Sequence, residues 1–316
     1  MSATTDTAPE VAVDSAASAA AAVRRRSVWH LLVRNPSVIF GGCIMALMVV
    51  VAIVAPYLGT VDPQQINPVN RNKLPGWERT LTNSAGEQYV RTYIMGTDKL
   101  GRDMYSRVIY GARISLVVGF AVAVLSIVFG LIIGLVSGYI RWLDSIVMRV
   151  MDGLMAIPGI LLAIALVSLS GAGLGTVILA ITIPEIPRVV RLIRSIVLSI
   201  REEPYVEAAI SVGTPLPLIL IRHVLPNTIA PLIVQGTYVC ASAILVEAIL
   251  SFLGAGIPPE IPTWGNIMAE SRIYFQIYPM QLLFPGLFLA FTVLAVNILG
   301  DGLRDTLDPR LAKRMQ

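Results

Sequence analysis

Groups that could perform chemistry are few in this sequence. The two histidines, His30 and His223, have no nucleophile and no metal-ligand spacing around them. No Gly-x-x-x-x-Gly-Lys-Ser/Thr segment occurs, and none of the three lysines follows a glycine-rich phosphate loop: Lys73, Lys99 and Lys313. We therefore expect no catalytic residues, no metal site and no cofactor bound by this chain.

One carboxylate stands out because its neighbours are apolar. Glu247 lies within the segment Leu-Val-Glu-Ala-Ile, and burying a carboxylate in hydrocarbon costs at least a few kcal/mol. Its side chain must therefore face protein or water. Two alternatives stay open: a place on a translocation path, or a structural hydrogen bond between helices.

Composition identifies the environment of the chain. Of 316 residues, 55% are hydrophobic and 14% are charged, against about 25% charged in ordinary soluble domains, and the mean hydropathy is +0.74. These values exclude a soluble globular protein. The net charge of +4 is explained by basic cytoplasmic loops, so nucleic-acid binding is not expected.

Apolar blocks predict an all-α polytopic membrane protein with six transmembrane helices, because about 20 helical residues cross the hydrocarbon core. The blocks are 37–58, 114–140, 155–169, 174–186, 229–253 and 282–299. Pro184 and Pro187 interrupt the fourth block, and we expect that helix to continue, kinked, towards Arg194.

The polar segments divide the chain further. We expect a disordered cytoplasmic tail with a basic flank at 1–35, a first transmembrane helix at 36–58, an extracytoplasmic loop at 59–112, a core domain at 113–301 and a cytoplasmic tail at 302–316. The distribution of Lys and Arg favours both termini inside. Within the outer loop, four charged residues recur at helical spacing and predict a solvated, salt-bridged amphipathic helix: Asp98, Arg102, Asp103 and Arg107.

Small residues mark a packing face on the second expected helix. Gly130, Gly134 and Gly138 form two overlapping small-xxx-small repeats. Such repeats let a neighbouring helix backbone approach closely. We expect helix packing here, with a pore-lining role as the alternative.

The cytoplasmic segment at 201–228 predicts a helix-turn-helix. Its first helix ends at Gly213, Pro215 precedes a second helix, and Pro226 marks a further break. The second helix is largely apolar although it lies outside the bilayer. Either a protein partner covers it or it lies on the membrane surface.

This segment resembles the EAA-x3-G-x9-I-x-L-P loop of binding-protein-dependent ABC importer permeases. The matching positions are Glu207, Ala208, Ala209, Gly213, Leu225 and Pro226. His223 stands at the Ile position of the motif, as in the peptide and nickel branch. Further blocks resemble the C-type permease subunit of dipeptide, oligopeptide and nickel importers, among them 95–98, 101–103, 110–113, 247–254 and 299–310.

The resemblance implies a type I ABC importer permease fold in a bacterial inner membrane. It implies four kinds of partner: a second homologous permease, two cytoplasmic subunits that bind ATP and Mg, an extracytoplasmic solute-binding protein and the lipid bilayer. The matched loop residues would couple to the ATPases mechanically, and 98–107 could alternatively contact the binding protein. The substrate would be a short peptide, or alternatively nickel or another small solute. A secondary transporter driven by an ion gradient is the alternative of another class.

Overall fold

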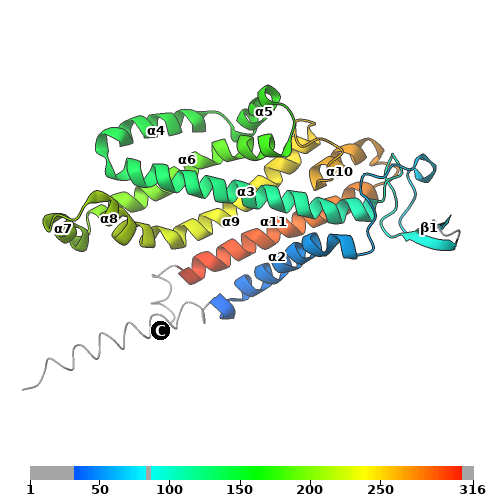
Figure 1. Cartoon of the computed structure of the whole chain (residues 1–316), viewed down its shortest axis with the longest axis horizontal. Coiled ribbons are helices and arrows are strands. Elements are labelled where there is room, and N and C mark those ends of the chain that lie inside the picture. The colour runs from blue at the N-terminus through cyan, green and yellow to red at the C-terminus, as the bar shows by residue number, and fades with distance from the viewer. Residues whose placement is uncertain (1–31, 83–86, 308–316) are drawn as a thin grey trace, which may run out of the picture.

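The computed structural model describes residues 32–82 and 87–307, and helices form almost all of this part of the chain (Figure 1). Two ends can be distinguished. The helix pair α7 (Pro204–Ser211) and α8 (Leu216–Ile219) projects from one end, while a small β-hairpin and helix α10 (Trp264–Ser271) lie at the other. Most of the expected N-terminal tail, and the end of the C-terminal tail, lie outside the described residues.

Four helices are long and apolar enough to cross a membrane. They are α2 (Pro36–Val54) with its 3-10 extension to Tyr57, α3 (Met104–Tyr139), α9 (Leu225–Phe252) together with α8, and α11 (Met280–Leu307). Helix α6 (Leu174–Arg201) is similarly long but less apolar, because its second half carries several arginines. As expected, α6 continues through Pro184 and Pro187.

The expected third span differs from the structure. A break at Ile157 and Pro158 separates α4 (Arg141–Ala156) from α5 (Gly159–Ser170), and the two helices are bent by 89°. Helix α5 has 12 residues, or about 18 Å at 1.5 Å per residue, which is too short to cross a core of about 30 Å. The break forms because a residue before proline disfavours the helical conformation. If the bent pair counts as one span, this test gives up to five spans instead of six.

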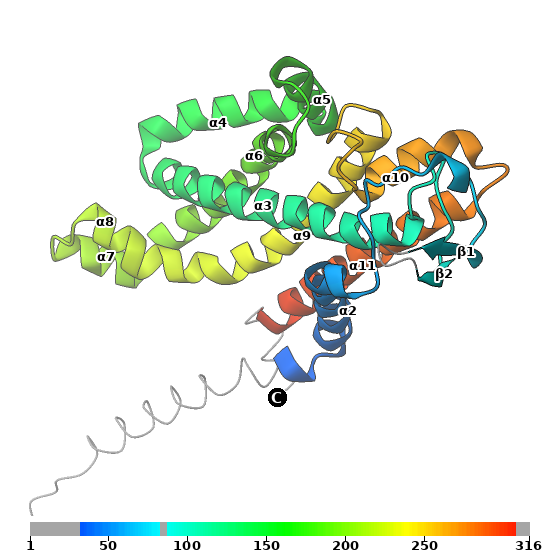
Figure 2. The same cartoon turned by 45° about the vertical axis from the view of Figure 1, so that its right-hand side comes forward.

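Helix α3 lies at the centre of the fold and packs against α6 and α9 (Figures 1 and 2). It begins at Met104, inside the segment expected to be loop. Asp103 caps its start, since the carboxylate accepts a hydrogen bond from the Ser106 backbone N–H at 3.2 Å. Helix α2 packs mainly on α11, and Asn35 donates to the Gly302 carbonyl and the Thr306 hydroxyl.

The β-hairpin is the one departure from an all-α fold in the described residues. Strands β1 (Trp77–Thr82) and β2 (Gln88–Tyr93) pair antiparallel, in register from Trp77 opposite Tyr93 to Thr82 opposite Gln88. Tyr93 is buried and its hydroxyl accepts a hydrogen bond from the Asn70 amide at 3.0 Å. The sequence reasoning missed this hairpin, because its residues lie in a polar segment with many turn formers.

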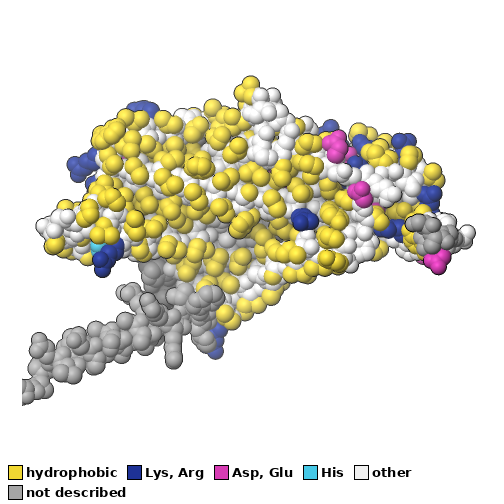
Figure 3. Space-filling view, viewed as in Figure 1, with side chains coloured by type: hydrophobic (Ala, Val, Ile, Leu, Met, Phe, Trp, Pro, Cys, Tyr) yellow, Lys and Arg dark blue, Asp and Glu magenta, His cyan; other side chains and the backbone are white. Residues whose placement is uncertain are grey.

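Apolar side chains cover the long sides of the molecule, whereas charged groups gather towards the two ends (Figure 3). Large exposed apolar residues lie along each of the long helices, for example Phe40, Phe120, Leu179, Ile233 and Phe291. A soluble protein would bury most of such a surface. The lipid bilayer is the environment that this surface fits.

Candidate functional site: coupling loop and membrane interior

The cytoplasmic loop expected at 201–228 forms the projecting end of the molecule. Helix α7 starts with Pro204 in its first turn and ends at Ser211. Gly213 follows with φ +81°, a left-handed conformation that glycine adopts at little cost. The Thr214 backbone N–H then donates to the Ala209 carbonyl at 3.0 Å, and Pro215 precedes α8.

The expected break at Pro226 is absent. Helix α8 passes through a π-helical turn at Leu220–Val224 directly into α9. Pro226 stands in the first turn of α9, where its missing N–H is tolerated. The chain from α8 to the end of α9 is therefore one long helical element, anchored at the loop end by buried Ile219 and Val224.

The predicted coupling residues occupy two places. Glu207 and Ala208 are exposed on α7, Ala209 is half-buried, and Gly213 is exposed at the turn. Leu225 and Pro226 lie instead at the start of α9. The loop also exposes large apolar side chains, of which Val212 is 86% exposed; the others are Tyr205, Ile210, Leu218 and Ile221.

Glu247 is buried at 0% exposure between α9 and α3. The Ser251 hydroxyl donates to one carboxylate oxygen at 2.8 Å, and the Ser115 hydroxyl of α3 lies 3.3 Å from the other. The bond from Ser115 joins α3 to α9, whereas the bond from Ser251 lies within α9. The geometry supports the structural alternative for Glu247, while a role on the translocation path stays a prediction.

Gly130, Gly134 and Gly138 lie against α6. A Cβ atom on these glycines would stand 2.5, 2.7 and 2.9 Å from the Cβ atoms of Val189, Ile193 and Val197 respectively. All three partners are buried at 0% exposure. The absence of side chains at these positions allows α3 and α6 to pack closely along three successive turns.

Helices α4 and α6 are also joined by ion pairs. Arg194 binds Asp144 through two nitrogens, at 2.5 and 2.7 Å, and Arg191 binds Asp152 at 2.6 Å. Both pairs are partly exposed to solvent. They hold the amphipathic α4 on the arginine-bearing half of α6.

The amphipathic outer helix expected from Asp98, Arg102, Asp103 and Arg107 is wrong. Asp98 and Arg102 lie in a loop before α3, and all four side chains are buried. Both arginines bind Asp98 at 2.6 Å and Glu270 of α10 at 2.5 Å. The i, i+4 spacing correctly predicted an ion pair between Asp98 and Arg102. The turn at Gly101 (φ +75°), however, excludes a helix there. Sequence reasoning missed Glu270, since no local pattern connects it with Arg107 and Arg102, which lie 163 and 168 positions earlier.

The described residues contain no group of three or more His, Cys, Asp or Glu side chains that could hold a metal ion. Within the membrane region, Glu247 is hydrogen-bonded to Ser115 and Ser251, and Glu185 is bonded to Arg188 and Ser242. Such an arrangement can transmit movement between helices and offers no nucleophile poised beside a base.

Comparison with known proteins places this arrangement in a family. The family described as "binding-protein-dependent transport system inner membrane component" matches residues 126–313, more than half of the chain, and the "N-terminal TM domain of oligopeptide transport permease C" matches residues 24–75. The first match includes the projecting loop, α6, α9 and α11.

Curated relatives extend over nearly the whole chain. A probable peptide ABC transporter permease protein of Sinorhizobium fredii is 52% identical, covering 95% of this chain and 98% of the relative. The dipeptide transport system permease protein of Alkalihalophilus pseudofirmus is 40% identical over 90% of each chain. The glutathione transport system permease protein of Pectobacterium atrosepticum is 37% identical, covering 90% of this chain and 91% of the relative.

A solved structure shows the same fold. The MetNI methionine ABC transporter, crystallised in inward-facing conformations, contains a chain that aligns with a TM-score of 0.52 at 18% identity, covering 65% of this chain and 98% of that one. The family match, the curated relatives and the shared fold are consistent with the projecting loop and with the apolar long sides of the molecule. The chain is a multi-pass membrane protein that belongs to the family of binding-protein-dependent transport system inner membrane components.

Proposed function

We propose that this chain is the C-type permease subunit of an ATP-driven importer of short peptides, in which it forms half of the translocation pathway. The observation that carries the proposal is the exposed apolar loop of a permease whose sequence contains no Gly-x-x-x-x-Gly-Lys-Ser/Thr segment. Val212 at 86% and Ile221 at 62% exposure require a cover. A cytoplasmic ATPase supplies that cover and hydrolyses the ATP.

The loop geometry suits mechanical coupling. Ala208 and Ala209 have short side chains that permit close docking of α7, and exposed Glu207 can pair with a basic group of the ATPase. Gly213 allows the sharp turn between the two helices. Because α6 leads into the loop and α8 continues into α9, a displacement of the docked loop moves two helices of the membrane domain.

The assembly then contains a second homologous permease, two ATP-binding subunits that hold ATP and Mg, and an extracytoplasmic solute-binding protein. The loop end, with both termini of the described chain, faces the cytoplasm of a bacterial cell. The hairpin end faces outside, where the binding protein delivers the solute. These assignments rest on the family and on the basic residues near the loop end.

The peptide substrate is supported by the names of the relatives, two of which are called peptide or dipeptide permeases. Nickel or another small solute is the second candidate within the same permease role, because the resemblance extends to nickel importers and a further relative is named for glutathione. An ion-gradient-driven secondary transporter is disfavoured. The interior carboxylates Glu185 and Glu247 are both engaged in bonds within the protein, and the projecting loop has no role in that class.

The test is reconstitution of the two permeases, the ATPases and the binding protein in proteoliposomes. We expect uptake of a labelled tripeptide to need ATP, Mg and the binding protein together. Dissipating the ion gradients with ionophores should leave uptake unchanged. Uptake that persists without the ATPases, or that collapses with the ionophores, would contradict the proposal.

A further inference from the structure

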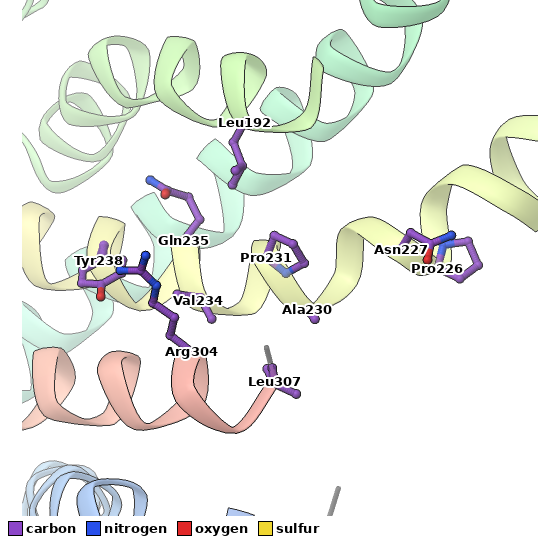
Figure 4. A pocket seen from close by; sticks show the side chains of 10 residues that line it. All are labelled: Leu192, Pro226, Asn227, Ala230, Pro231, Val234, Gln235, Tyr238, Arg304 and Leu307. Atoms are coloured by element: carbon purple, nitrogen blue, oxygen red, sulfur yellow. The ribbon is translucent and has the colours of Figure 1, made fainter. Parts of the chain in front are cut away.

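Two hollows in the surface of the described residues have different surroundings. One lies between α6, α9 and α11, beside the start of α9 and therefore next to the coupling loop (Figure 4). The other has a volume of about 400 Å³ and lies between α2 and α3. Both of these helices are long and apolar enough to cross a membrane. This second hollow, the α2/α3 groove, therefore faces the lipid bilayer.

The α2/α3 groove is apolar over most of its lining. Ala52 of α2 and Leu116 of α3 are buried and form its floor, whereas Ile53 and Phe120 are exposed and form its rims. Phe120 alone is 70% exposed. A large apolar side chain so far exposed needs an apolar neighbour, and beside a membrane-spanning helix a lipid acyl chain is that neighbour.

One charged group interrupts this apolar surface. Arg113 of α3 is exposed, and it is the single charged residue among those that line the groove. Its side chain forms no hydrogen bond or ion pair with any described residue. The arginines one and two turns further out differ in this respect, since Arg107 and Arg102 are both paired with Asp98. A guanidinium that faces lipid without a carboxylate partner requires an anion from outside the chain.

The depth of Arg113 selects that anion. Arg113 shares the groove with Ala52 and Ile53, which lie four and five residues before Tyr57, where the apolar span of α2 ends. The corresponding distance along the helix axis is about 6–8 Å. An arginine this close to the end of a span extends its head to the membrane interface, while its stem stays on the apolar surface. The anions at that level are phospholipid phosphates.

The length of the groove suits an acyl chain. From Arg113 to Ala121 the lining follows α3 towards the middle of the membrane for eight residues, or about 12 Å at 1.5 Å per residue. One leaflet contributes about 15 Å to a hydrocarbon core of about 30 Å. A lipid whose phosphate lies at Arg113 therefore has its chain along the groove and not across it.

We propose that the α2/α3 groove binds one anionic phospholipid, with its phosphodiester on the Arg113 guanidinium and one acyl chain between Ile53 and Phe120. Guanidinium donates two parallel hydrogen bonds to a phosphate, which favours this anion over a single point contact. A zwitterionic phospholipid carries an ammonium group that opposes the positive charge of Arg113. The site therefore prefers a lipid such as phosphatidylglycerol over phosphatidylcholine with the same chains.

Binding is tested by photo-crosslinking. The full chain, with the subunits that copurify with it, is placed in phosphatidylcholine nanodiscs that contain a trace of photoreactive lipid. The probe is phosphatidylglycerol or phosphatidylcholine with the same diazirine-bearing acyl chain, and labelled peptides are located by mass spectrometry. We expect the anionic probe to label residues 49–53 and 116–121 about five-fold more than the zwitterionic probe. Labelling around Phe291, an exposed apolar residue of α11, reports ordinary surrounding lipid and should differ less than about two-fold between the probes.

Variants separate the charge from the groove. Arg113→Gln should bring the ratio between the two probes at the groove close to that at Phe291, whereas Arg113→Lys keeps the charge and should retain part of the preference. Val117→Trp changes an exposed residue that lines the groove; it fills the space, keeps Arg113 and should lower labelling by both probes. Arg149→Gln, at an exposed arginine of α4 outside the groove, is the matched control and should label like the parent.

Thermal unfolding gives a second readout. A lipid that binds the folded chain stabilises it, so phosphatidylglycerol should raise the Tm of the parent and of Arg149→Gln by about 2–4 °C over phosphatidylcholine. The Tm of Arg113→Gln should be the same in both lipids.

The proposal is overturned if the two probes label the groove of the parent equally, or if Arg113→Gln keeps the preference for the anionic probe. It is also overturned if residues 49–53 and 116–121 stay unlabelled by both probes, as they would where another subunit covers the groove. Labelling requires neither ATP nor a transported solute, so failure of the import function would leave these results unaffected.

Discussion

At the scale of single residues, the membrane interior keeps its carboxylates bonded. Glu185 is 6% exposed, pairs with Arg188 at 3.0 Å and accepts from Ser242 of α9 at 3.3 Å. Glu247 accepts from serines on two helices. Glu185 therefore links α6 to α9, and Glu247 links α9 to α3. A carboxylate without partners would cost several kcal/mol in this environment.

Replacing Glu247 tests this role. Glu247→Gln keeps an acceptor for Ser251 and should change the free energy of unfolding little. Glu247→Ala leaves the serine hydroxyls without acceptor and opens a cavity, so we expect a loss of about 2–4 kcal/mol. Denaturant titration in mixed micelles measures the free energy of unfolding of both variants. Equal stability of the alanine variant and the parent would contradict the structural role, and strongly reduced uptake by a stable glutamine variant would favour the translocation path.

At the scale of elements, close helix contact joins α3 to α6, and buried ion pairs join α10 to α3. Helices α3 and α6 meet along the glycine face at 130, 134 and 138. At the outer end, Glu270 binds Arg102 and Arg107 and thereby joins α10 to α3 and to the loop before it. The indole N–H of Trp264 adds a bond to the Val108 carbonyl at 3.1 Å.

Gly134→Ala should weaken the contact between α3 and α6. Its Cβ would lie 2.7 Å from Ile193 Cβ and 3.0 Å from the Val190 carbonyl oxygen, so we expect a loss of about 1–3 kcal/mol in unfolding free energy. Gly153→Ala is the matched control. That glycine lies inside α4 with no atom within 4 Å of the added Cβ, and the change should stabilise by about 0.5–1 kcal/mol. An unchanged free energy of unfolding in Gly134→Ala would refute close packing of α3 against α6 at this position.

Glu270→Ala should destabilise the contact of α10 with α3 and with the loop before α3. It removes one carboxylate from two arginines that are 5% and 1% exposed, and breaking a buried pair from one side costs about 3–5 kcal/mol. Faster hydrogen exchange is expected in α10 and at residues 96–103. The exposed Glu260 provides the control, Glu260→Ala. Unchanged protection in the Glu270 variant would show that the network carries little stability.

At the scale of the whole molecule, the two ends differ: the helix pair α7 and α8 projects from one, and the β-hairpin and α10 lie at the other. Helix α3 spans the distance between them, while α6 and α9 connect the projecting loop with the membrane interior (Figure 2). The projecting loop is anchored by buried Val206, Ile219 and Val224. We therefore expect it to move as a rigid unit.

Glu207→Lys and Gly213→Val should uncouple transport from ATP hydrolysis. The first reverses the charge offered to the ATPase, and the second places a branched residue at φ +81°, a strain of about 1–2 kcal/mol. We expect uptake to fall about ten-fold or more, whereas each permease still folds. Gly175→Val is the control, because Gly175 has equally open space and no positive φ. Parent-like ATP-dependent uptake by both loop variants would count against coupling through this loop.

The sequence by itself determined the membrane class, the helix-turn-helix and the family, because hydropathy, glycine and proline signals, and short motifs are local properties. Gly213 and Pro215 are examples, since their backbone preferences act on adjacent residues only. Only the tertiary structure decided the partners of distant groups. Glu270 meets Arg107, because helix packing joins residues that no local pattern relates. The hairpin likewise depended on contacts around it, whereas the bend at Pro158 follows from a local preference that the sequence analysis did not use. The helix-turn-helix of the projecting loop is thus predictable from the sequence alone, whereas the partners of Glu270 required the fold.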